Sequence, residues 1–361
     1  MNIQDKYKFL ENSFSDVLGG ISDLIQKARI SKRFHQVSLT EAEKALLLKA
    51  KEICEIQINN LWDNKESEEF RAYCMTYFDI ATIFDIQLVN ENDLLEYLKI
   101  IFFGYLGEHN HSVKSYLKSQ EKKIKEIIIP EKWELRLLYL IFEAINLLVV
   151  KNDWKDVSAA VEKINRLRLE QKKFEKMYLK DMAEENVSYG SAELISLYHF
   201  AKCIDILGTY LLEGRPNDAE SQIEYHIRVA SEFSELSQNI TLFLLLKYFS
   251  AFSAKLIRNT IWYTLSGVNH FVSEFNKFIS KRDSNGVFEL LYPQKYSIIR
   301  GELFNPSNRS IVLNLPTSSG KTLVAEYKIL QALNEFKQKG GWVAYVVPTK
   351  TLINQIFARL S

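Results

Sequence analysis

The feature that most constrains the fold is the rarity of helix-breaking residues over the first 280 positions. Only two of the six prolines, Pro130 and Pro216, lie there, and apolar residues recur at spacings of three and four. This period places the apolar side chains on one face of each successive helix. The pattern predicts a mainly α-helical fold in which residues 1–281 form a large, irregular domain of packed helical hairpins.

Turn and capping signals divide this part into hairpins. Ser38-Leu-Thr-Glu41 has the spacing of a capping box and predicts a helix over 40–62. Asn217-Asp-Ala-Glu220 predicts a second capping box, directly after the turn at 213–217. The hairpins resemble tetratricopeptide-like solenoids, but no fixed period recurs, so the sequence does not predict a repeat array.

The composition limits the classes of partner and the compartment. The net charge of +1 gives no global field toward nucleic acid, so such contacts must come from local patches. The three cysteines lack C-x-x-C spacing, which argues against a disulfide framework or zinc site and predicts a cytoplasmic protein. The polar N-terminus has no signal-like apolar stretch, and polar residues interrupt the apolar runs at 135–150 and 242–257. We therefore expect buried helices there and no membrane partner.

A cluster of turn formers at 282–286 predicts the boundary of a second domain. Beyond it, β-branched runs predict strands at 311–315 and 342–347, on either side of a helix over 323–338. A β-α-β order implies a parallel sheet with a right-handed crossover. Residues 282–361 are therefore expected to begin a nucleotide-binding α/β domain.

The turn between the first predicted strand and the helix reads Pro316-Thr-Ser-Ser-Gly-Lys-Thr322. Backbone N–H groups of such a turn and of the helix N-terminus form an anion site, and a glycine allows close approach of the ligand. The lysine would reach the phosphates, and the threonine hydroxyl would ligate Mg²⁺. Leu315 stands where the strict phosphate-loop pattern has its first glycine. The predicted nucleotide-binding residues are Pro316, Thr317, Ser318, Ser319, Gly320, Lys321 and Thr322, with Lys321 and Thr322 also predicted as catalytic and Thr322 as the Mg²⁺ ligand.

Two further motifs flank this loop. Upstream, Leu291-Tyr-Pro-Gln294 places an amide that can donate to and accept from an adenine edge, although a plain turn explains it equally well. Downstream, Pro348, Thr349 and Lys350 follow the second predicted strand and can hold a nucleic-acid phosphate. An ordinary strand-to-helix loop is an equally good interpretation of this motif by itself.

Together the three motifs resemble the Q-type motif, motif I and motif Ia of superfamily 2 helicases, with wording closest to the Ski-like DExH branch. That branch lacks the first glycine of motif I, which agrees with Leu315. The resemblance covers about the last fifth of the chain. It implies a RecA-like domain at 282–361, ATP and Mg²⁺ as cofactors, Gln294 at the adenine, and Pro348, Thr349 and Lys350 along the bound strand. The implied activity is that of an ATP-dependent nucleic-acid helicase or translocase, with DNA expected rather than RNA.

No D-E-x-H follows motif Ia in the sequence, so we expect the N-terminal part of a longer helicase that by itself hydrolyses ATP negligibly. The long helical region ahead of motif I is similar to that of helicases in bacterial antiphage defence systems. An alternative treats this region as an interaction module that docks a partner protein, such as a nuclease. Direct nucleic-acid contact through the basic stripe at 114–125 is a further possibility, and a non-helicase phosphate-loop ATPase is the remaining one.

Overall fold

The computed structural model divides the chain into two compact units, Met1–Ile257 and Arg258–Ser361. The predicted mainly α-helical fold is confirmed. The structure describes residues 7–34, 38–84, 86, 91–127, 131–181, 186–283, 286–305, 307–308, 310–316, 319–337, 340–347, 350–351, 353–354 and 357.

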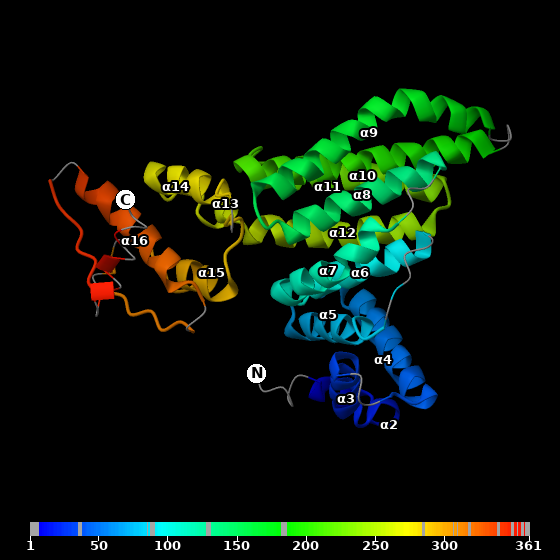
Figure 1. Cartoon of the computed structure of the whole chain (residues 1–361), viewed down its shortest axis with the longest axis horizontal. Helices are drawn as coiled ribbons and strands as arrows, with labels where there is room; N and C mark the ends of the chain where they lie inside the picture. The colour runs from blue at the N-terminus through cyan, green and yellow to red at the C-terminus, as the bar shows by residue number, and fades with distance from the viewer. Residues whose placement is uncertain are drawn as a thin grey trace. The chain divides into compact units, whose positions relative to one another are not determined.

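The first unit, called the helical unit below, is built from packed helical hairpins. Figure 1 shows α8, α9, α10 and α11 lying side by side, and α4 packs on α5, which packs on α6. The elements are α1 (Lys8–Ser13), α2 (Ser15–Leu18), α3 (Ile21–Phe34), α4 (Glu41–Asn60), the 3-10 turn η2 (Trp62–Asn64), α5 (Glu68–Ala81), α6 (Glu91–Leu106), α7 (Asn110–Lys125), α8 (Trp133–Val150), α9 (Trp154–Asp181), α10 (Val187–Glu213), α11 (Ala219–Leu236) and α12 (Ile240–Asn259).

The two predicted capping boxes differ from the observed helix starts. At α4 the box is formed by Thr40 and Glu43: Glu43 N–H donates to Thr40 Oγ1 at 3.2 Å, and Thr40 N–H donates to Glu43 Oε2 at 2.9 Å. The sequence pattern fits Ser38 and Glu41 equally well, so only the start of the helix decides between them. At α11 the N-cap is Asp218, which forms no side-chain cap bond, so the second predicted box is wrong.

Helix α12 lies at the centre of an aromatic cluster. Its Phe249 ring centroid lies 5.9 Å from Phe102 of α6 and 4.9 Å from Phe200 of α10. Among the described helices, α12 alone is long and apolar enough to cross a membrane by length and composition. In this structure its apolar side chains are buried within the helical unit, and the predicted burial of both apolar runs is confirmed.

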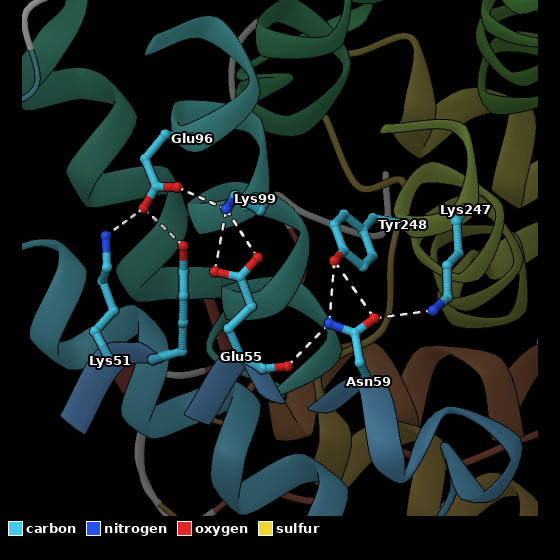
Figure 2. A network of polar contacts seen from close by, with 8 residues as sticks. Lys51, Glu55, Asn59, Glu96, Lys99, Lys247 and Tyr248 are labelled. Atoms are coloured by element: carbon cyan, nitrogen blue, oxygen red, sulfur yellow. Dashed lines mark hydrogen bonds and ion pairs between the residues drawn. The ribbon is translucent and has the colours of Figure 1, made fainter. Parts of the chain in front are cut away.

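A network of ion pairs joins α4 to α6 (Figure 2). Lys99 Nζ lies 2.9 Å from Glu55 Oε1 and 2.7 Å from Glu96 Oε2, and Lys51 Nζ lies 2.6 Å from Glu96 Oε1. Burial by itself raises the pKa of Glu96, but the ammonium groups of Lys99 and Lys51 lower it to about 2. Both sides of this helix pair therefore depend on charges that are partly removed from water.

The same network continues from α4 to α12 through Asn59. Its Nδ2 donates to Tyr248 Oη at 3.2 Å, and its Oδ1 accepts from Lys247 Nζ at 2.9 Å (Figure 2). Lys247 Nζ also lies 4.8 Å from the centre of the Trp62 ring. Residues nearly two hundred positions apart are thus joined by directional bonds, which fixes how α12 packs on α4.

The second unit, called the C-terminal unit below, contains α13 (Ile261–Thr264), α14 (His270–Ser280), α15 (Tyr292–Ile299) and α16 (Lys321–Phe336). The predicted boundary at 281 and 282 differs from this division, because residues 258–281 pack with the unit that follows them. Tyr327 Oη of α16 donates to Asn276 Oδ1 of α14 at 2.8 Å, and its ring lies 5.5 Å from that of Phe275. These buried contacts attach α14 to α16.

The predicted strands do not form. Residues 311–316 and 341–347 are described without strand structure, and within the described residues the pairing of β type is an isolated bridge between Thr260 and Glu289. A strand requires backbone hydrogen bonds to a neighbour, and no such bonds join these two segments in the described part of the chain. Val312 and Val346 are consequently 91% and 90% exposed.

Candidate nucleotide-binding site

The loop before α16 has the backbone of a phosphate-binding turn. Ser319 N–H and Ser319 Oγ both donate to the Pro316 carbonyl, at 3.1 and 2.6 Å, which closes the turn. Gly320 follows as the N-cap of α16 with φ of 69° and ψ of 42°, in the left-handed region that favours glycine. Lys321 is the first residue of α16 and is exposed, and Thr322 is half-buried beside it. The loop therefore presents a helix N-terminus and a lysine to solvent.

Gln294 joins the upstream motif to this loop. Its Oε1 accepts from Leu291 N–H at 2.8 Å, which caps α15, and its Nε2 donates to the Gly320 carbonyl at 3.1 Å. The residue is only 3% exposed. A Cβ on Gly320 would lie 2.4 Å from Gln294 Nε2, so a glycine is required for this close approach as well as for its φ angle. Two motifs that are 26 residues apart are thus in direct contact.

Leu315, which replaces the first glycine of the strict pattern, has a packing role. It is 9% exposed and belongs to a core that includes Leu290, Leu323, Val324 and Tyr327. A glycine at this position would leave that part of the core unfilled. The departure from the general pattern is therefore accommodated by burial of the side chain.

Helix α16 is predicted to have its apolar side at Ile329, Leu330, Leu333 and Phe336. The structure instead buries the side that carries Val324 and Tyr327, while Leu333 and Phe336 are each 40% exposed. The helix has apolar residues on two sides, and its sequence alone does not rank them. The prediction of which side faces the core is wrong.

Sequence reasoning missed the polar residues that hold the segment before the loop. Lys328 Nζ donates to the Leu303 carbonyl at 2.9 Å, and Gln331 Nε2 donates to the Phe304 carbonyl at 2.8 Å. Gln331 is 8% exposed, so these bonds replace water on carbonyl groups beside the core. A buried glutamine in an apolar helix was the available signal, although its partners could not be read from the sequence.

The structure covers the remaining predicted site residues in part. Thr317, Ser318, Pro348 and Thr349 lie outside the described residues. Lys350 is described and is exposed. The structure thus brings together Gln294, Ser319, Gly320 and the N-terminus of α16, and it does not relate Lys350 to them.

The chemistry available at this site is anion binding. The partial positive charge of the N-terminus of α16 and the Lys321 ammonium both favour a polyanion such as a phosphate chain. Within the described residues, no group of three or more His, Cys, Asp or Glu side chains could hold a metal ion by itself. A Mg²⁺ ion would have to share its coordination between Thr322 and the phosphates, which is the usual arrangement when few protein ligands are present.

Comparison with known proteins agrees with this geometry. The family described as DEAD/DEAH box helicase matches residues 294–361. A relative described as "ATP-dependent DNA helicase Hel308" in Pyrococcus abyssi is 36% identical over 72 residues, which cover 20% of this chain and 9% of that protein. A protein with the same description in Methanocella arvoryzae is 36% identical over 75 residues, which cover 21% of this chain and 9% of that protein.

Both the family match and these alignments fall on the part of the chain that carries Gln294 and the loop ending at Thr322, and the aligned residues span only about a tenth of each relative. The segment from Gln294 onward is accordingly similar to the DEAD/DEAH box helicases.

Proposed function

We propose that the chain is part of an ATP-dependent nucleic-acid helicase or translocase and that its C-terminal unit binds ATP with Mg²⁺. The observation that carries the proposal is the bond from Gln294 Nε2 to the Gly320 carbonyl, because it connects two motifs of the matched family at the N-terminus of α16. Bound Mg²⁺ would neutralise charge on the phosphates. Lys321 would bind the phosphates, and Thr322 would ligate the ion.

The role of Gln294 is refined by its surroundings. Both ends of its amide are bonded within the chain, to Leu291 and Gly320, so contact with adenine requires an exchange of one of these partners. We propose that ATP binding makes this exchange. Gln294 would then report the presence of the base to the phosphate loop through the carbonyl it releases.

Several finer assignments belong to the same proposal. The descriptions of the Hel308 relatives favour DNA over RNA as the strand. Placement in the Ski-like branch is supported by Leu315 at the position of the first glycine. A role in bacterial antiphage defence, in the cytoplasm, is supported by the long helical region ahead of motif I. Pro348, Thr349 and Lys350 are proposed to lie along the bound strand.

Nucleotide binding, measured directly, tests the proposal. A fluorescent ATP analogue with Mg²⁺ is expected to bind the 361-residue chain, and Lys321→Ala is expected to weaken binding at least roughly tenfold by removing a charged hydrogen bond. Lys281→Ala is the matched control, since Lys281 is an exposed lysine of the same unit. Equal binding by the wild type and the Lys321 variant would overturn the assignment of the loop.

A further inference from the structure

A groove in the helical unit lies between α7, α8 and α9. Its volume is about 600 Å³, within the range of roughly 300–1,000 Å³ found for ligand sites. Apolar side chains from two helices line it: Leu117 and Ile124 of α7, and Leu147 and Val150 of α8. The groove belongs to neither the phosphate loop nor the motifs of the matched family, so a different explanation is needed for it.

Asn146 of α8 is the unusual residue of this groove. It lies in an apolar helix, lines the groove, and is only 8% exposed. Neither its Oδ1 nor its Nδ2 has a hydrogen-bond partner in the described part of the chain. A buried amide without partners destabilises a fold, and an apolar residue of similar size would avoid that cost. A polar residue at this position therefore indicates a ligand that supplies both an acceptor and a donor.

The charges that line the groove largely cancel. Lys163 Nζ lies 2.9 Å from Glu143 Oε2, and Lys125 Nζ lies 2.6 Å from Glu121 Oε1. Asp156 Oδ2 accepts from Asn152 N–H at 2.8 Å. A phosphate backbone would meet these carboxylates, which disfavours nucleic acid in the groove.

Lys118 is the lining lysine that forms no salt bridge among the described residues, and it is exposed. It leaves one positive charge at the edge of an otherwise balanced and partly apolar groove. A ligand with a neutral backbone, apolar side chains and a single acidic group matches this distribution of charge.

We propose that this groove binds an extended peptide segment of a partner protein. A peptide group offers one C=O and one N–H, which are the acceptor and the donor that the Asn146 amide requires. The amide atoms are shielded from water in the structure, so the side chain must turn toward the groove that it lines. Apolar peptide side chains would cover Leu117, Ile124, Leu147 and Val150, and an acidic side chain would face Lys118.

The test uses the full 361-residue chain and a synthetic library of N-acetylated, C-amidated heptapeptides, without nucleotide. We expect the peptides that bind to contain an acidic residue next to apolar residues. Fluorescence polarisation is expected to show at least a tenfold weaker affinity for Asn146→Leu, together with a higher Tm, because the variant removes an unsatisfied buried amide. A rise in Tm with loss of binding separates recognition from damage to the fold.

A charge exchange at Lys118 provides an independent arm. Lys118→Glu should weaken the acidic peptides about tenfold and restore binding when the acidic residue of the peptide is replaced by lysine. Lys122→Ala is the matched control, since Lys122 lies on the same helix, outside the groove, with its side chain 89% exposed. That variant should leave peptide affinity unchanged.

Three results would overturn the proposal. These are the absence of any binding peptide, equal affinity for the wild type and Asn146→Leu, and displacement of bound peptide by a single-stranded DNA oligonucleotide with loss of DNA binding in Asn146→Leu. Lys321→Ala should retain peptide binding, so failure of the ATP-binding proposal and failure of this one are distinguishable.

Discussion

The helical unit and the C-terminal unit treat their side chains differently. In the helical unit, Lys99 is held by carboxylates on two helices, and Phe249 is fully buried among rings from α6 and α10. In the C-terminal unit, Val312, Trp342 and Val346 are 91%, 81% and 90% exposed. A helix satisfies its own backbone and needs only a packed face, whereas an extended segment needs a paired strand to bury its side chains. The difference teaches that the first unit is held by its own packing, while the extended segments of the second lack such contacts.

The largest expected effect comes from the aromatic core of the helical unit. Phe249→Ala should lower the free energy of unfolding of this unit by about 3–5 kcal/mol, because it leaves a cavity in contact with Phe102 and Phe200. Hydrogen exchange followed by mass spectrometry should show faster exchange in α6 and α10 and little change in α16.

A matched control is Leu236→Ala on α11, where the side chain is 62% exposed. Its effect should stay within about 0.5 kcal/mol. If Phe249→Ala accelerated exchange in α16 as much as in α6, the two units would not be separately stabilised and the comparison would be wrong.

A smaller effect is expected from the ion pairs of the helical unit. The pKa of Glu96 lies at about 2 in the folded chain, below the ordinary value of 4.5, so the carboxylate is stabilised by folding. Its contribution, on the order of 3 kcal/mol, is fully present above pH 4.5 and is lost as the pH falls toward 2.

Urea unfolding at pH 7, 4.5 and 3 measures this contribution. Glu96→Gln should be less stable than the wild type at pH 7, and the difference should shrink as the pH falls. Glu41→Gln is the control, because the Glu41 side chain is 90% exposed and pairs only with Lys44 at the surface. A difference between Glu96→Gln and the wild type that is independent of pH would exclude Glu96 as the group responsible.

The smallest effect sharpens the comparison within the C-terminal unit. Gly320→Ala should cost about 1–3 kcal/mol for its backbone angles, and it should also displace Gln294, because the new Cβ would lie 2.4 Å from Nε2. Weaker binding of the fluorescent ATP analogue should accompany the loss of stability.

Gly267→Ala separates the two causes, since Gly267 has φ of +77° and open space around its Cβ position. It should show the backbone cost without the loss of nucleotide affinity. In a double-mutant cycle, Gln294→Ala should recover part of the cost of Gly320→Ala. Additive effects of the two substitutions would show that the contact between Gln294 and Gly320 contributes nothing.

The sequence predicted the site well where a local pattern is sufficient. The turn before α16, the start of the helix near Lys321 and the position of Gln294 next to a helix N-terminus all follow from short-range signals. The bond between Gln294 and Gly320, the burial of Leu315 and the grip of Lys328 and Gln331 on residues 303–304 required the fold. Each of these joins segments that no periodic pattern relates.

By itself, the sequence determined that the chain is mainly helical and that a phosphate-type loop precedes a helix near its end, because helix period and turn chemistry act over a few residues. Only the tertiary structure decided that residues 258–281 belong with the loop, that segments 311–316 and 341–347 remain unpaired, and that Asn146 is buried without a partner beside a groove. The physical reason is that burial and hydrogen-bond satisfaction depend on distant neighbours, which local propensity does not specify.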